Sequence, residues 1–154
     1  MKKANLFMYV LLTMFIVSCS KDDDSNNTTD DDLLIGVWKP VKDVWTNNGV
    51  VEVYNYNTCE QKSRITFEGN GNMKTLSFYD NEGTSNCIED NYGFISGSWE
   101  KISEGSYKVT TTYYDEYTKK NETDIDTVSI SFPTPNTMKV LYDATDYSEY
   151  SRVR

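Results

Sequence analysis

The sequence predicts an all-β domain made of antiparallel hairpins, because three observations agree. Its 154 residues include 12 tyrosines and only 3 prolines, and aromatic side chains suit pleated, half-buried strands. Short runs alternate between apolar and polar residues, as at Val128, Ile130 and Phe132, and turn-forming clusters of Gly, Asn and Asp separate these runs. No stretch beyond about ten residues carries the 3.6-residue apolar period of an amphipathic helix.

The alternating runs place the expected strands in the C-terminal part of the chain. They cover residues 36–46, 50–57, 63–68, 73–79, 97–102, 107–117, 122–132, 137–142 and 147–153. Residues 80–96, rich in Gly and Asn, are expected to form a loop. So many consecutive hairpins leave unpaired sheet edges unless the sheet closes. We therefore expect a single antiparallel up-and-down barrel of about eight strands.

The N-terminus predicts a segment that is removed. Lys2 and Lys3 precede a mostly apolar run from Ala4 to Val17, 14 residues long. As a helix this run would cover roughly 21 Å, short of the ~30 Å hydrocarbon thickness of a membrane. It fits the apolar region of a signal peptide better than a membrane span. The alternative, a core helix of the mature fold, is disfavoured by the lysines and by the terminal position.

The residues that follow resemble two bacterial signals. Ile16 to Cys19 (IVSC) resembles a lipobox, which implies a lipoprotein signal peptide at residues 1–18 and acyl chains on Cys19 that hold the protein on the membrane. The alternative is an ordinary signal peptide with a chance cysteine. Ser20 to Asp24 (SKDDD) resembles the acidic export signal of surface lipoproteins in Bacteroidetes bacteria. This implies an outer membrane lipoprotein on the cell surface, with a periplasm-facing lipoprotein as the alternative.

Residues 19–32 are expected to form a lipidated, disordered tether, because no apolar residue occurs between Ser20 and Asp32. The domain then spans residues 33–154. In the whole chain, 24 acidic residues outnumber 15 basic ones, and histidine is absent. The acidic excess argues against a nucleic-acid partner, because phosphate binding needs clustered Lys and Arg. We expect a monomer with no cofactor and no bound metal.

One motif indicates the type of barrel. Leu34 to Trp38 (LIGVW) resembles the Gly-x-Trp signature that opens lipocalin and lipocalin-like barrels. In that family the tryptophan closes one end of the barrel, which implies structural floor positions for Gly36 and Trp38. Residues 97–100 (GSWE) and 147–154 (YSEYSRVR) are similar to segments of small lipocalin-like domain lipoproteins of Bacteroidetes. The resemblance spans residues 33–154, although no second long motif of the large lipocalins is present.

Once Cys19 is assigned to lipid, Cys59 and Cys87 remain as an even pair in an oxidising compartment. They flank residues 63–79, where two hairpin strands of an antiparallel meander could bring them together. We expect a disulfide, worth roughly 3.5 kcal/mol in the chain-entropy description. Free thiols or a redox pair are the alternatives, but there is no C-x-x-C motif.

Five residues are tentative ligand-binding positions, and four of them alternate along one expected strand. They are Tyr107, Val109, Thr111, Tyr113 and Trp99. A lipid-anchored barrel that binds a small apolar or amphipathic ligand is the first hypothesis. Small barrels are also found filled by their own side chains. In that alternative, the protein would bind or inhibit another protein through its loops, with Tyr92 and Phe94 in residues 80–96.

An enzyme is the least favoured class. Without histidine, no Ser–His or Cys–His relay is possible. Paired carboxylates occur at residues 89–90, 115–116 and at Asp124 and Asp126, but we expect these to be solvated charges near turns. Residues 126–128 (DTV) match a short O-glycosylation pattern at Thr127 of exported Bacteroidetes proteins, although they lie in an expected strand.

Overall fold

The computed structural model describes residues 32–81, 86–90 and 93–154. The expected signal peptide, Cys19 and the tether up to residue 31 lie outside the described residues, as does Tyr92. Within the described ranges, no helix has the length and apolar character needed to cross a membrane.

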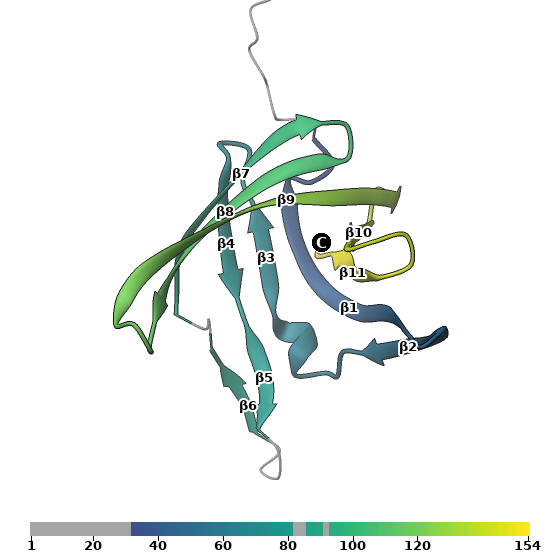
Figure 1. Ribbon diagram of the computed structural model, residues 1–154, viewed down its shortest axis with the longest axis horizontal. Coiled ribbons are helices and arrows are strands. Elements are labelled where there is room, and N and C mark those ends of the chain that lie inside the picture. The colour runs from purple at the N-terminus through teal and green to yellow at the C-terminus, as the bar shows by residue number, and fades with distance from the viewer. Residues whose placement is uncertain (1–31, 82–85, 91–92) are drawn as a thin grey trace, which may run out of the picture.

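The described chain is almost entirely strand, as the sequence predicts. The strands are β1 (Gly36–Asn47), β2 (Val50–Asn55), β3 (Arg64–Phe67), β4 (Asn72–Leu76), β5 (Phe78–Asn81), β6 (Asn86–Glu89), β7 (Phe94–Ser103), β8 (Ser106–Asp115), β9 (Lys120–Thr134), β10 (Thr137–Leu141) and β11 (Tyr147–Arg152), with a short 3-10 turn, η2 (Glu60–Lys62). The main sheet runs β11-β10-β9-β8-β7-β4-β3-β1-β2, and β11 also pairs with β1. Eight antiparallel strands thus close into a barrel, with β2 outside the closed ring (Figure 1). This confirms the predicted barrel.

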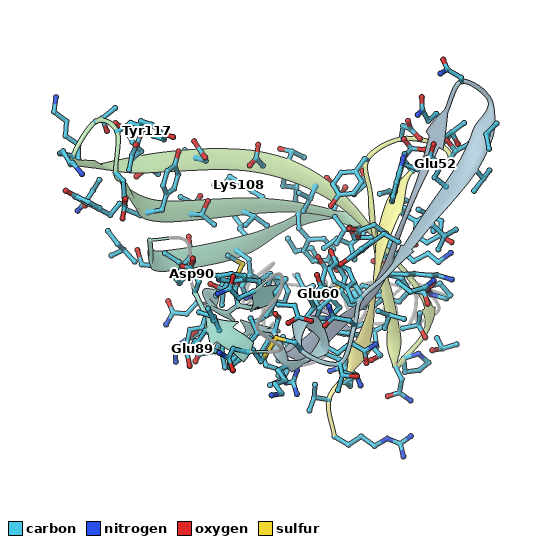
Figure 2. The ribbon with its side chains drawn as sticks, turned by 90° about the horizontal axis from the view of Figure 1, so that it is seen from below. Glu52, Glu60, Glu89, Asp90, Lys108 and Tyr117 are labelled. Atoms are coloured by element: carbon cyan, nitrogen blue, oxygen red, sulfur yellow. A yellow bond between two sulfur atoms is a disulfide. The ribbon has the colours of Figure 1, made fainter. Side chains whose placement is uncertain are left out.

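Strand β1 serves two parts of the molecule. Its first residues pair with β3, from Gly36 opposite Phe67, and its second half pairs with β2. A register shift between Pro40 and Lys42 separates the two halves on the β11 side. The β1–β2 hairpin therefore projects beyond the barrel, with Glu52 on its outer strand (Figure 2).

Two expectations about the middle of the chain are wrong. Residues 73–79 form two strands, because pairing stops at Ser77 and β5 leaves the main sheet. Residues 80–96 are not one loop: β6 pairs with β5, with Cys87 opposite Asp80, and β7 already begins at Phe94. The β6 sequence is too short and polar to show alternation, so its partner strand determines its conformation.

The core lies at one end of the barrel. Its buried side chains are Leu34, Trp38, Phe67, Met73, Trp99, Tyr107, Ile130 and Met138. We call this end the floor. At the opposite end β4 and β7 separate, because they pair only through Asn72–Ser98 and Met73–Gly97. We call this end, where β7, β8 and β9 extend away from β4 and β5 (Figure 1), the mouth.

Candidate functional site

The floor is built around the Gly-x-Trp motif. Trp38 is fully buried, and its indole N–H donates to the Leu34 carbonyl oxygen at 2.8 Å. The Arg152 guanidinium lies 4.3 Å from the centre of the Trp38 ring. Its two terminal nitrogens donate to the carbonyl oxygens of Ile35 and Leu33, each at 2.6 Å. Gly36 has φ +141°, and a Cβ there would collide with the Arg152 guanidinium.

Asp32 adds a second polar cluster to the floor. Its carboxylate accepts hydrogen bonds from the Leu34 N–H at 2.8 Å and the Tyr107 hydroxyl at 2.9 Å, and Lys101 Nζ lies 3.0 Å away. Burial alone would raise the pKa of Asp32, but the hydrogen bonds from Leu34, Lys101 and Tyr107 hold it below its usual value. Asp32 is the last residue of the expected tether, yet its side chain contacts Tyr107 and Lys101 of the barrel.

Cys59 and Cys87 form the predicted disulfide, with their Cα atoms 5.4 Å apart. The bond ties the turn before η2 to β6. It therefore holds the β5–β6 hairpin beside the barrel wall. Among the described residues, no three Cys, Asp or Glu side chains gather where a metal ion could be held.

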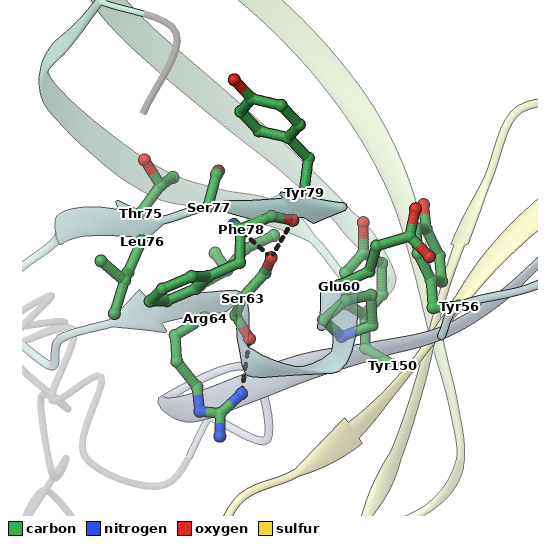
Figure 3. A pocket seen from close by; sticks show the side chains of 12 residues that line it. Tyr56, Glu60, Ser63, Arg64, Thr75, Leu76, Ser77, Phe78, Tyr79 and Tyr150 are labelled. Carbon is green, nitrogen blue, oxygen red and sulfur yellow. Dashed lines mark hydrogen bonds between the residues drawn. The ribbon is translucent and has the colours of Figure 1, made fainter. Parts of the chain in front are cut away.

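A pocket of about 330 Å³ opens one layer above the floor. Its walls include four inward residues that each lie two positions beyond a floor residue on the same strand: Pro40, Ile65, Thr75 and Tyr150. The remaining lining residues come from the turns and from β3 to β5, and they are Tyr56, Glu60, Ser63, Arg64, Leu76, Ser77, Phe78 and Tyr79 (Figure 3). Aromatic and aliphatic side chains therefore form most of the wall, and we call this cavity the aromatic pocket.

The break between β4 and β5 helps to shape this pocket. Ser63 Oγ accepts a hydrogen bond from the Phe78 N–H at 2.9 Å and lies 3.3 Å from the Phe78 carbonyl oxygen (Figure 3). The hydroxyl thus satisfies backbone groups that the barrel ladder no longer pairs after Ser77. This allows Phe78 and Tyr79 to line the pocket.

A hydrogen-bond network lies behind the tyrosines of the pocket. The Tyr56 hydroxyl donates to Asp43 Oδ2 at 2.7 Å, and Ser148 Oγ donates to Asp43 Oδ1 at 2.5 Å. The Tyr142 hydroxyl lies 2.9 Å from Ser148 Oγ. Burial raises the pKa of Tyr56, and its hydrogen bond to Asp43 raises it further; burial likewise raises the pKa of Tyr150. Both phenols are therefore neutral at physiological pH.

The five tentative ligand-binding residues lie elsewhere. Tyr107 and Trp99 are 1% and 5% exposed, with ring centres 6.0 Å apart, so they fill the floor. Val109 packs against the core. Thr111 and Tyr113 lie farther along β8, and Tyr113 lines a second hollow of about 460 Å³ near the tip of the β8–β9 hairpin. None of the five lines the aromatic pocket.

Sequence reasoning missed Tyr56 and Tyr150 as pocket residues. Tyr150 could have been found, because Ser148, Tyr150 and Arg152 alternate along β11. Tyr56 lies in the expected strand 50–57, but β2 ends at Asn55, and the irregular segment that follows places Tyr56 at the pocket. The carboxylate pairs of the sequence also remain apart from the pocket: Glu89 and Asp90 lie at the end of β6 (Figure 2).

Comparison with known families agrees with this architecture. Residues 34–140, more than half of the chain, match the sequence model of the Lipocalin-like domain. The chain therefore belongs to the lipocalin-like domain family. No curated protein matches it with significance. The barrel fold gives the domain the capacity to bind a ligand.

Proposed function

We propose that this domain binds a small apolar or amphipathic molecule in the aromatic pocket, as a non-catalytic protein held on the outer membrane by acyl chains on Cys19. The single observation that supports ligand capture is the pocket of about 330 Å³ above the floor. Binding sites for small molecules are typically concave, largely apolar and about 300–1,000 Å³ in volume. The pocket falls at the small end of that range.

The chemistry of the wall also suits such a ligand. Phe78, Ile65 and Pro40 provide apolar surface, and Tyr56 and Tyr150 provide aromatic faces with neutral hydroxyls. Aromatic side chains with a polar edge are suited to molecules that are apolar along their body and polar at one end.

A neutral fluorescent probe, N-phenylnaphthylamine, tests capture directly. We expect it to bind the wild-type protein, and we expect Thr75→Trp to abolish binding, because Thr75 faces the pocket opposite Ile65. Thr66→Trp is the matched control, since Thr66 alternates to the outward face of the neighbouring strand. Native mass spectrometry of protein from its own cells should show a retained molecule. Failure of wild-type protein to bind the probe and absence of a retained molecule would together refute capture.

The location is supported by the sequence alone. The lipobox ends at Cys19, and the acidic residues that follow resemble a surface export signal. Cys19→Ala should release the protein from the membrane fraction and abolish labelling with a fatty-acid probe. Protease digestion of intact cells separates surface display, where the domain is digested, from a periplasm-facing lipoprotein, where it is protected.

A second candidate function, binding of another protein, is favoured by one surface. Strand β2 lies outside the closed ring, and Val50, Val51, Val53 and Tyr54 are 63%, 64%, 50% and 42% exposed. An apolar edge strand of this kind is suited to pairing with another chain. A cross-linked partner that is lost in Val51→Lys/Val53→Lys, but retained in Thr75→Trp, would support this function over capture.

A further inference from the structure

The inward face of the β8–β9 hairpin changes character between the floor and the mouth. These two strands pair without interruption, so alternate residues keep to one face. The pair Tyr107–Val128 lies at the floor and packs in or against the core. The next three cross-strand pairs on that face are Val109–Asp126, Thr111–Asp124 and Tyr113–Glu122. Three carboxylates therefore follow one another along the inner wall towards the mouth.

No basic side chain lies across from these carboxylates in β8, since their partners are Val, Thr and Tyr. Lys108 belongs to the opposite face, where its Nζ lies 2.6 Å from Glu100. The inward-facing cations Lys101 and Arg152 are at the floor and already bind Asp32 and backbone carbonyls. Lys120 is the next residue of β9 on this face, but it lies opposite Asp115, so that pair carries one charge of each sign. Within the described strands, the row Glu122, Asp124 and Asp126 therefore gives the inner wall beyond the floor a net negative charge.

The charged side chains around the aromatic pocket are two carboxylates and one guanidinium, which together leave a net negative charge. Asp43 lies behind Tyr56, and Glu60 lines the pocket. Arg64 also lines it, but its neighbours Ile65 and Phe67 determine which face it occupies. Because Ile65 and Phe67 are on the barrel side, Arg64 alternates outwards, and its Nη1 donates to the carbonyl oxygens of Gln61 and Ser63. Its guanidinium is therefore held by backbone carbonyl oxygens at the edge of the pocket, and Figure 3 shows the bond to Ser63.

We propose that the barrel selects its ligand by charge, accepting neutral and preferentially cationic amphiphiles and rejecting anionic ones such as fatty acids. This inference rests on the proposed capture function and specifies the ligand class. Glu60 lines the pocket, and the row Glu122, Asp124 and Asp126 lies on the inner face of the β8–β9 hairpin; both would repel an anionic head group. An ammonium group would instead be attracted by these carboxylates, with the ring of Tyr113 on the same face as an additional cation–π surface.

Three ligands with the same apolar chain test the charge preference: octylamine, octanol and octanoate. Each is titrated against the full-length protein carrying N-phenylnaphthylamine, at pH 7 and low salt. We expect octylamine to displace the probe at a concentration at least about tenfold lower than octanoate, with octanol between them. The difference should shrink at high salt, because exposed carboxylates are screened.

The double variant Asp124→Asn/Asp126→Asn should reduce the amine preference at least about threefold. The matched control is Glu52→Gln/Glu100→Gln, which changes the net charge equally on outward surfaces and should keep the preference. Octanoate binding as tightly as octylamine, or equal effects of the two double variants, would overturn charge selection while leaving capture intact. Failure of the wild-type protein to bind the probe would instead refute capture itself.

Discussion

The floor and the mouth of this barrel are built on opposite principles. At the floor, packing and hydrogen bonds to the backbone of Leu34 and Ile35 hold the side chains of Trp38, Arg152 and Asp32 in place. At the mouth, β4 and β7 share only two residue pairs, and the inner wall carries carboxylates rather than core side chains. Stability is therefore concentrated at the closed end, which leaves the open end free to vary for binding.

The largest expected effect comes from removing the centre of the floor. Trp38→Ala should lower the free energy of unfolding by about 3–5 kcal/mol, because a fully buried aromatic ring leaves a cavity. Chemical denaturation measures this value. Tyr117→Ala, at a side chain that is 99% exposed at the hairpin tip (Figure 2), should change it by less than about 0.5 kcal/mol. Similar losses at the two sites would remove the distinction between the ends.

The disulfide provides the next largest effect. Cys59→Ser/Cys87→Ser should destabilise the fold by up to roughly 3.5 kcal/mol, because the unfolded chain gains entropy when the 28-residue separation is no longer bridged. Since the bond holds the β5–β6 hairpin beside the pocket, probe affinity should also fall. A variant with lower stability but unchanged probe affinity would show that the pocket does not depend on this hairpin.

Asp32 gives a smaller effect with a defined pH dependence. Asp32→Asn should cost about 1–3 kcal/mol at pH 7, because it weakens charge-assisted hydrogen bonds to Leu34, Tyr107 and Lys101. The folded-state pKa of Asp32 lies below its ordinary value of 3.8, so its contribution is present above that value and is lost as the pH falls through the folded-state pKa. Denaturation curves of wild type and variant should therefore converge in acid; a constant gap would contradict this assignment.

Thr75 lines the pocket above the floor, where we expect a smaller change in stability than at Asp32. Thr75→Trp should alter the free energy of unfolding by less than about 1.5 kcal/mol, because the new side chain enters existing space instead of a packed core. Probe binding should nevertheless be abolished. A loss of stability comparable to that of Trp38→Ala would mean that this layer belongs to the core.

The sequence was informative where a residue's role follows from local pattern. Alternation located most of the strands, and the even pair of cysteines predicted the disulfide. The resemblance to the Gly-x-Trp signature implied structural positions for Gly36 and Trp38 at one end of the barrel. It was uninformative where the role depends on distant partners. Asp32 cannot be distinguished from the aspartates before it, because its partners Tyr107 and Lys101 are remote in sequence. Likewise, β6 pairs with β5 without any periodic signal of its own.

The position of Asp32 also bears on how the molecule is oriented. The described chain begins at the closed end, where the Asp32 carboxylate contacts Tyr107 and Lys101. If acyl chains on Cys19 hold the protein, the barrel is attached to the membrane through its closed end. The opening would then lie at the end of the barrel away from the attachment point, and the expected disordered tether would leave it accessible to molecules in the surrounding solution. Tether length would set how far from the membrane they are intercepted.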